Sequence, residues 1–409
     1  MAEPQVEVRP GKPAIPAGGG VILDVLVKIT PPTPDVHFVR PPINLGLVLD
    51  RSGSMAGAQK MACAREAAAF AVEQLLPTDQ VSVTIFDSVV ETIVPNAPAT
   101  NKPAIVSLIH QIHPRGATAL HAGWKEGADQ VERHQIHGGL NRVILLSDGL
   151  ANEGVSDPNV IAGECKARAG RSVSTTTMGL GDDYNEDLMQ KMGEDGDGNY
   201  YFIETSAQLA DIFHTELKGL MANLGTKVSL GLEPQAGTTV TEVLNEMDRG
   251  PLGRLMLPNL IVGMPIQVVL RVSVPALPHP TELIKFRLAW DDPKTGERRT
   301  HYASLTMPVV TRAEWDAMAA DEAVAEQVAF QMAAKAKKEA IAHFDAGDEC
   351  ATRAYLGGAR LLLRAHESPE AWKEIAELDE IAAHLDQGEG AVFRKKTMWQ
   401  AFRKKRGNE

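Results

Sequence analysis

The stretch 43-INLGLVLDRSGSM-55 begins like a buried strand and ends as a polar turn. Its first seven residues are almost all apolar, which is typical of a strand that is covered on both faces of a parallel sheet. Asp50, Ser52 and Ser54 then place oxygen-bearing side chains at alternate positions of the turn. One carboxylate and two hydroxyls at this spacing indicate a turn that gathers oxygen ligands.

The region that follows, residues 43–224, alternates between strand-like and helical segments. Runs rich in β-branched residues and separated by helices predict a doubly wound, mostly parallel sheet with helices on both faces. The segment 89–95 follows its predecessor too closely for a crossover, so we expect an antiparallel edge strand there. Residues 206–224 read as a long closing helix, with Gly225 as the expected hinge to the next region.

The sequence pattern changes in residues 225–311, where short strand-like segments are separated by Pro, Gly and Asn. This pattern predicts an antiparallel β-sandwich. The early segment "GGGVILDVLVKIT" has the same character, so residues 1–42 are expected to contribute a strand to the sandwich. The α/β domain would then be an insertion in the sandwich. The alternative is a loose N-terminal strand on the α/β domain. Residues 312–409 are expected to form a helical C-terminal region.

Two more oxygen-bearing residues join the polar turn. Asp148 ends the strand "VILLSDG", and Thr118 lies in "RGATAL", just before a helix. Ligands of open α/β sheets bind beyond the carboxyl ends of the strands, so Asp50 and Asp148 are expected to share one crevice. Two carboxylates there repel each other unless a cation, a proton or an arginine intervenes. Oxygen-only ligands suit a hard divalent cation such as Mg²⁺, with Ca²⁺ or Mn²⁺ as alternatives.

The three pieces together resemble a known motif. Asp50-x-Ser52-x-Ser54, then Thr118 in a "GAT" loop, then Asp148 in "SDG", is similar to the metal-ion-dependent adhesion site of von Willebrand factor type A domains. The resemblance implies that Ser52, Ser54 and Thr118 hold the ion directly or through water. Asp50 and Asp148 would hold it directly or through intervening groups. For the first three residues alone, a turn that caps the next helix is the alternative.

This resemblance covers about residues 43–223 and implies a Rossmann-like fold. The flanking regions resemble bacterial proteins of the calcium-activated chloride channel-like type and the heavy chains of inter-alpha-trypsin inhibitor. A channel function is not expected, since no run approaches the ~18 apolar residues of a membrane span.

The function implied by the resemblance is a non-catalytic, metal-dependent protein–protein interaction. The bound ion would leave one position open for an Asp or Glu of a partner protein, a charge-assisted contact. Intracellular members of the family often serve AAA+ ATPases or multi-protein assemblies, so a partner of that kind is expected. A metal-dependent hydrolase is one alternative, although the sequence offers no base beside the site. An oligomeric scaffold in which the metal only braces the fold is the other.

Composition and charge narrow the remaining classes of function. A net charge of −12 argues against nucleic acid as a main partner, because phosphate binding needs basic surface. The first residues lack the basic start and apolar run of a signal peptide, and a cytoplasmic protein is expected.

The C-terminal stretch "VFRKKTMWQAFRKKRG" is strongly basic. As an amphipathic helix it could meet an acidic partner or an anionic membrane surface. We favour the other reading, a terminal helix that packs back on the acidic body through Trp399 and Phe402. A preceding helix is expected to start at Pro369, with Ser368 as its N-cap.

Overall fold

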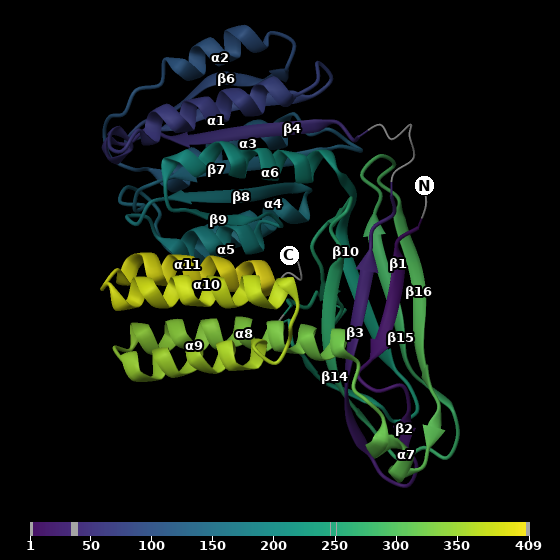
Figure 1. Cartoon of the computed structure of the whole chain (residues 1–409). Coiled ribbons are helices and arrows are strands. Elements are labelled where there is room, and N and C mark those ends of the chain that lie inside the picture. The colour runs from purple at the N-terminus through teal and green to yellow at the C-terminus, as the bar shows by residue number, and fades with distance from the viewer. Residues whose placement is uncertain (1–2, 34–39, 246, 251, 406–409) are drawn as a thin grey trace. The chain divides into compact units, whose positions relative to one another are not determined.

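The computed structural model describes residues 3–33, 40–245, 247–250 and 252–405. The chain divides into two compact units. The α/β unit contains residues 39–223 and 293–296, and the sandwich–helix unit contains residues 1–38, 224–292 and 297–409. Figure 1 labels the elements of both units.

A six-stranded sheet forms the centre of the α/β unit, with the strand order β6-β5-β4-β7-β8-β9. Its strands are β4 (Ile43–Asp50), β5 (Gln80–Phe86), β6 (Val90–Pro98), β7 (Leu140–Ser147), β8 (Val173–Leu180) and β9 (Tyr200–Ile203). The neighbours pair in parallel, except that β6 pairs with β5 in the antiparallel direction. The expected mostly parallel sheet with an antiparallel edge strand is therefore confirmed.

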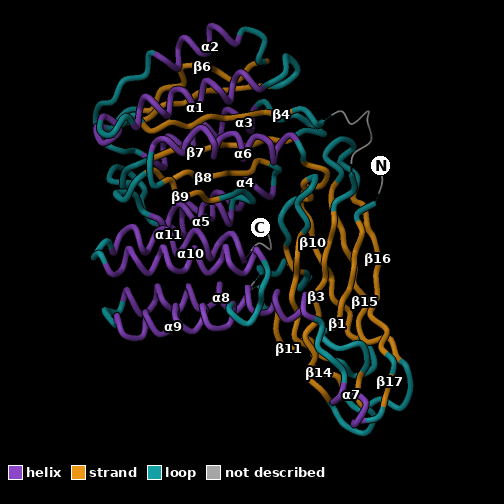
Figure 2. The backbone as a smooth tube through the Cα atoms, in the orientation of Figure 1, coloured by secondary structure: helices purple, strands orange, loops and turns teal. Residues whose placement is uncertain are grey.

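Helices cover both faces of this sheet (Figure 2). They are α1 (Lys60–Gln74), α2 (Lys102–His110), α3 (Leu120–Arg133), α4 (Pro158–Gly170), α5 (Glu186–Asp195) and α6 (Leu209–Met221). Helices α1, α2 and α6 share one apolar core with the sheet. On the other face α3 approaches β4 so closely that an ideal Cβ on Gly127 would lie 2.2 Å from Val48 Cγ2. Only glycine permits this contact without a shift.

Two antiparallel sheets form the sandwich. The first has the order β1-β3-β14-β11 and the second β12-β10-β15-β16, with β13 paired to β10. Their strands are β1 (Gln5–Pro10), β3 (Val21–Thr30), β14 (Ile266–Val274), β11 (Thr239–Val243), β12 (Leu255–Met256), β10 (Asn223–Pro234), β13 (Leu260–Ile261), β15 (Thr281–Asp291) and β16 (Arg298–Met307). A short parallel pair joins β2 (Ile15–Pro16) to β17 (Val309–Val310).

The pairing of β3 with β14 decides the connectivity of the chain. These strands pair along their length, from Val21 opposite Val274 to Ile29 opposite Ile266. Apolar residues of both sheets then form one core. Because β3 precedes the α/β segment in sequence and β14 follows it, the α/β unit is an insertion in the sandwich, as expected.

The role expected for Gly225 is wrong. Helix α6 ends at Met221, and Gly225 lies inside β10 instead of forming a hinge before it. An ideal Cβ on Gly225 would lie 2.6 Å from Cδ1 of Trp290 on the paired strand β15. The glycine is needed because β10 passes directly against the indole ring.

The expected helical C-terminal region is present and packs on the sandwich. It contains α7 (Arg312–Ala317), α8 (Glu322–Asp345), α9 (Glu349–Leu363), α10 (Pro369–Asp386) and α11 (Gly390–Lys405). Ser368 caps α10 by accepting a hydrogen bond from the backbone N–H of Ala371, as predicted. Val324 of α8 packs with Leu26 of β3 and Val269 of β14, so the helices and the sandwich share one unit.

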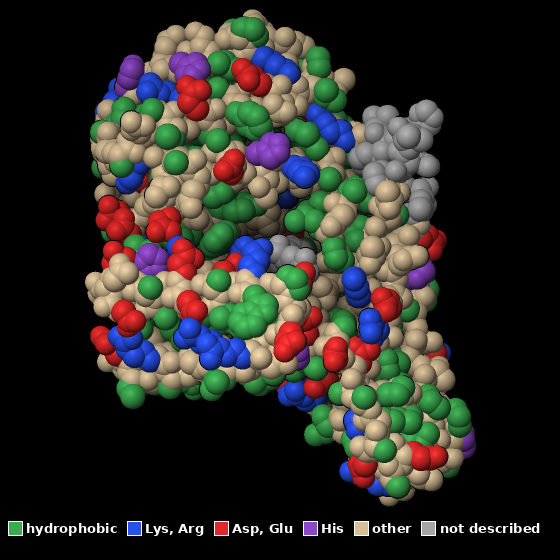
Figure 3. All heavy atoms as spheres, in the orientation of Figure 1, with side chains coloured by type: hydrophobic (Ala, Val, Ile, Leu, Met, Phe, Trp, Pro, Cys, Tyr) green, Lys and Arg blue, Asp and Glu red, His purple; other side chains and the backbone are tan. Residues whose placement is uncertain are grey.

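The basic stretch forms α11, and its cations pair with acidic residues of the same unit. The pairs are Arg394–Asp345 at 2.9 Å, Lys396–Glu380 at 2.6 Å, Arg403–Glu377 at 2.8 Å and Lys404–Glu374 at 3.2 Å. Phe402 is buried. On the face shown in Figure 3, acidic and basic side chains are interspersed over the helical region. This arrangement agrees with a terminal helix that packs back on the body.

Among the described residues, no helix combines the length and the apolar character that a membrane crossing requires.

Candidate functional site

Two buried carboxylates lie at the carboxyl edge of the α/β sheet. Strand β4 ends at Asp50, and Asp148 directly follows the end of the neighbouring parallel strand β7. Both residues have an exposed fraction of 0%. Parallel neighbours end at the same edge, so the two acidic side chains emerge together, as the sequence predicted.

The two serines of the turn connect these carboxylates. The backbone N–H of Ser52 donates to Asp50 Oδ1 at 2.7 Å. The hydroxyl oxygens of Ser52 and Ser54 are 3.0 Å apart, and Ser54 Oγ donates to Asp148 Oδ1 at 2.6 Å. The alternate spacing in the sequence therefore places both hydroxyls between the two acids.

Thr118 reaches the same place from the loop before α3. Its backbone N–H donates to the Asn152 side chain at 3.0 Å, and its carbonyl accepts from the Asn152 backbone N–H at 3.3 Å. An ideal Cβ on Gly149 would lie 3.0 Å from Thr118 Oγ1 and 3.6 Å from Ser54 Oγ. Thr118 Oγ1 and Ser54 Oγ thus flank a small space at Gly149, so Thr118 lies beside the serine turn that links Asp50 to Asp148.

The electrostatics of Asp50 show that acidic charge is in excess beside it. The pKa of Asp50 is raised to about 6, because burial and the nearby Asp148 carboxylate raise it by more than the hydrogen bonds from Ser147 and Ser52 lower it. A group shifted in this way is stabilised in its ionised form when a cation is near. The set of carboxylate and hydroxyl oxygens matches the ligand preference of a hard divalent cation.

Two residues of the site were not found from the sequence. Ser147 donates a hydrogen bond from its hydroxyl to Asp50 Oδ2. Lys60 is the first residue of α1, and its Nζ lies 2.6 Å from Asp148 Oδ2. The available signal was position: the helix that follows the polar turn must start at the same sheet edge, so its first residue lies beside the acids.

Arg51 and Asp87 brace the loops around the site. Arg51 turns away from the acids of the site and pairs with Asp87, Nε to Oδ2 at 2.9 Å, while Arg115 donates to the same oxygen at 2.7 Å. Burial raises the pKa of Asp87, but its bonds to Arg115 and Val89 and the charge of Arg51 hold that pKa below the usual range.

Backbone hydrogen bonds add to this bracing. The N–H of Arg115 donates to the carbonyl of Arg51 at 2.7 Å, and the N–H of Gly53 donates to the carbonyl of Gly116 at 3.1 Å. The β4 turn and the loop before α3 are therefore tied together by the chain itself. These bonds hold the oxygen-bearing side chains of the two loops near one another.

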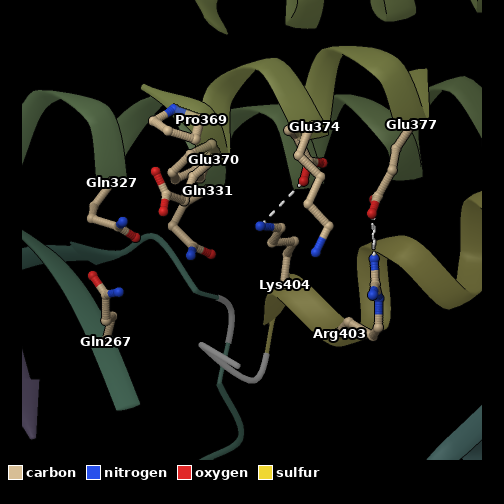
Figure 4. A pocket seen from close by; sticks show the side chains of 11 residues that line it. Gln267, Gln327, Gln331, Pro369, Glu370, Glu374, Glu377, Arg403 and Lys404 are labelled. Atoms are coloured by element: carbon tan, nitrogen blue, oxygen red, sulfur yellow. Dashed lines mark hydrogen bonds and ion pairs between the residues drawn. The ribbon is translucent and has the colours of Figure 1, made fainter. Parts of the chain in front are cut away.

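A second polar hollow, of about 200 Å³, lies in the sandwich–helix unit among β14, α8, α10 and α11 (Figure 4). Its lining includes Gln267, Gln331, Lys373 and the ion pairs Arg403–Glu377 and Lys404–Glu374. Those cations and carboxylates neutralise one another. The edge of the α/β sheet, where acidic charge is in excess, is the stronger candidate.

Known proteins match both the α/β unit and the longer chain. The family model of the von Willebrand factor type A domain matches residues 44–215. An uncharacterized protein of Escherichia coli (strain K12), YfbK, is 26% identical over 194 residues, which cover 47% of this chain and 34% of that protein. The inter-alpha-trypsin inhibitor heavy chain H3 of Mus musculus is 26% identical over 208 residues, 46% of this chain and 23% of that protein.

A solved structure described as a von Willebrand factor type A protein from Catenulispora acidiphila shares the fold, with a TM-score of 0.73 and 19% identity over 93% of this chain and 90% of that chain. The chain spans about a third of the first curated relative and a quarter of the second. The expected likeness to inter-alpha-trypsin inhibitor heavy chains is confirmed. The expected likeness to calcium-activated chloride channel-like proteins finds no support in these matches.

Proposed function

Since residues 44–215 form a von Willebrand factor type A domain, we propose that this protein binds other proteins through a divalent metal ion held at the edge of its α/β sheet. One observation supports this proposal above the others. Five oxygen-bearing side chains from three separate segments meet at the carboxyl ends of β4 and β7, and they are Asp50, Ser52, Ser54, Thr118 and Asp148.

The roles of these residues follow from their chemistry. The hydroxyls of Ser52, Ser54 and Thr118 would hold the ion directly or through water, and the two carboxylates would neutralise it. Hard cations such as Mg²⁺, Mn²⁺ and Ca²⁺ accept six or more oxygen ligands, so a position is left for a carboxylate from outside. The bound ion would supply a positive charge that an Asp or Glu of a partner protein can complete.

Binding is favoured over hydrolysis by the groups that touch the two acids. In the part of the chain that the structure describes, these groups are hydroxyls, a backbone amide and the ammonium of Lys60. None of them is an imidazole or a further carboxylate, the side chains that most often act as general bases. An AAA+ ATPase or another multi-protein assembly in the cytoplasm is the kind of partner that we propose.

The proposal is tested by comparing Asp50→Ala with Asp182→Ala, an exposed acid just after β8 at the same sheet edge. Calorimetric titration with Mg²⁺ should show binding to the wild type and to Asp182→Ala but none to Asp50→Ala. The circular dichroism of all three should agree, because the sheet core does not depend on the ion. Mg²⁺ affinity that survives in Asp50→Ala would remove this site from consideration.

Partner binding is tested by affinity capture from source cells with and without a chelator. The captured proteins should disappear with the chelator and with Asp50→Ala, and should remain with Asp182→Ala. If chelation leaves both the captured proteins and the circular dichroism unchanged, the ion is not the contact. A scaffold in which the metal only braces the fold would then be the better account.

A further inference from the structure

We propose that Lys60 is a built-in counter-ion of the site, which a divalent ion must displace from Asp148, so that Lys60 sets the affinity for the metal. The inference rests on the proposed metal site but not on any partner protein.

Asp148 has a protein partner on each of its carboxylate oxygens. Its Oδ2 accepts from Lys60 Nζ at 2.6 Å, and its Oδ1 accepts from Ser54 Oγ at 2.6 Å. Both oxygens of this fully buried carboxylate are thus engaged within the protein. An ion that uses Asp148 or Ser54 as a ligand must change these contacts, and the ammonium is the group that carries a like charge.

The path of the Lys60 side chain shows that this contact is built into the fold. Its side chain is 16% exposed, so the stem is largely covered. An ideal Cβ on Gly181, just after the end of β8, would lie 3.6 Å from Lys60 Nζ and 3.7 Å from Cε. Gly181 has a φ of +74°, a conformation that favours glycine, and the end of the lysine side chain lies beside this turn. The helix start and the strand end together direct the ammonium to the acids.

The charges at the site indicate that Lys60 weakens metal binding. Asp50 and Asp148 bring two negative charges when ionised, and Lys60 offsets one of them. A divalent ion at the same oxygens would be repelled strongly by an ammonium a few ångströms away, because the partly buried site screens charge less than water does. The flexible four-carbon stem lets the lysine swing into solvent, at the cost of its bond to Asp148.

Two opposite consequences follow for a variant without this charge. Lys60→Met should bind metal more tightly, because no internal cation competes with the ion. The same variant should be less stable without metal, because Asp148 loses its cationic partner beside Asp50. A lysine with a merely structural role would lower stability without raising metal affinity.

The experiment is calorimetric titration of the full chain with Mn²⁺ or Mg²⁺ alone. We expect Lys60→Met to bind about tenfold more tightly than the wild type and Lys60→Arg, which keeps the charge, to stay close to the wild type. Lys102→Met is the matched control, since Lys102 lies at the start of α2 and bonds to the Glu73 carbonyl. It should bind like the wild type.

Thermal unfolding gives a second readout. Without metal, Lys60→Met should melt below the wild type, and saturating metal should raise its melting temperature by more than it raises that of the wild type. Equal or weaker metal affinity in Lys60→Met, with intact binding by the wild type, overturns this inference alone. If the wild type binds no divalent ion, the proposed metal site itself is overturned, and the role of Lys60 with it.

Discussion

Two regions of the molecule bury acidic side chains, and they treat the charge in opposite ways. In the sandwich–helix unit, Glu374 of α10 is 2% exposed and pairs with Lys337 of α8 and Lys404 of α11. At the edge of the α/β sheet, Asp50 and Asp148 are equally buried, and Lys60 is the cation that pairs with Asp148 among the described residues. In the first region two lysines pair with one buried carboxylate, whereas in the second one lysine faces two buried carboxylates.

The pKa shifts record this difference. Burial raises the pKa of Glu374, but the charges of Lys337 and Lys404 hold it below its ordinary value. Burial and the neighbouring acid raise the pKa of Asp50 to about 6. The lowered pKa of Glu374 agrees with a carboxylate that is already paired within the protein. The raised pKa of Asp50, beside a second acid and several hydroxyls, agrees with the proposed cation site.

The largest expected effect is on the stability of the first region. Lys337→Met removes the fully buried partner of Glu374 and leaves Lys404 alone. It should lower the free energy of unfolding by about 3 kcal/mol, because breaking a buried ion pair leaves its carboxylate poorly compensated. Chemical denaturation followed by circular dichroism measures this. The double variant Lys337→Met/Glu374→Met is the control and should recover much of the loss. A loss below about 1 kcal/mol would show that the pair is not a closed structural unit.

A smaller effect is expected in the pH dependence of that stability. Because the pKa of Glu374 is lowered by folding, its contribution is present above the ordinary glutamate pKa of about 4.3 and is lost as the pH falls through the folded value. Glu374→Gln should therefore be less stable than the wild type at pH 7, by about 2 kcal/mol, and the difference should shrink below pH ~4. Denaturation curves at several pH values measure it. A difference that is constant from pH 7 to pH 3 would contradict the assigned shift.

The third prediction concerns the space between the ligands of the edge site. Gly149→Ala would place a methyl group 3.0 Å from Thr118 Oγ1 and 3.6 Å from Ser54 Oγ. Since this crowds the Thr118 hydroxyl without touching a carboxylate, Mg²⁺ affinity should fall about tenfold, or ~1.4 kcal/mol, while the metal-free fold persists. Calorimetric titration measures the change, and Gly163→Ala on α4, with open space around its Cβ, is the control. Unchanged affinity in Gly149→Ala would mean that Thr118 does not face the ion.

The smallest effect is expected at the rim of the edge site. The Arg115 side chain is 60% exposed. When Arg115 is removed, its partner Asp87 still forms the ion pair with the buried Arg51. Arg115→Gln should therefore change neither thermal stability nor Mg²⁺ affinity measurably, because exposed ion pairs contribute little. Arg51→Gln is the informative partner variant and should weaken both. Equal effects of the two variants would show that the bracing does not depend on the buried arginine.

Much of the fold was predictable because it is local in origin. The apolar run ending in Asp50 and the helix lengths between strands predict the parallel sheet, and the short run at 89–95 predicts its antiparallel edge. The strand β1 was missed, because "QVEVRP" alternates over only a few residues and its valines are only half-buried. The close contact of Gly225 with Trp290 joins residues far apart in sequence, so no local pattern distinguishes it from a hinge.

In the candidate site, too, the residues with a local sequence pattern were predicted and those without one were not. Asp50, Ser52 and Ser54 share one turn, and Thr118 and Asp148 occupy recognisable positions before a helix and after a strand. Lys60 has only a positional signal, the start of the helix after the polar turn, and a lysine at such a place is most often solvated. Its contact with Asp148 comes from the structure, which places the ammonium on a buried carboxylate that lies 88 residues away in sequence.

The proposed metal site is tested most directly by a crystal structure with Mn²⁺, read by anomalous scattering. We predict one strong anomalous peak at the carboxyl edge of β4 and β7, at about 2.2 Å from Ser52 Oγ and Ser54 Oγ. We also predict that Lys60 Nζ has left Asp148. No peak at saturating Mn²⁺, with Lys60 still bonded to Asp148, would contradict the proposed site.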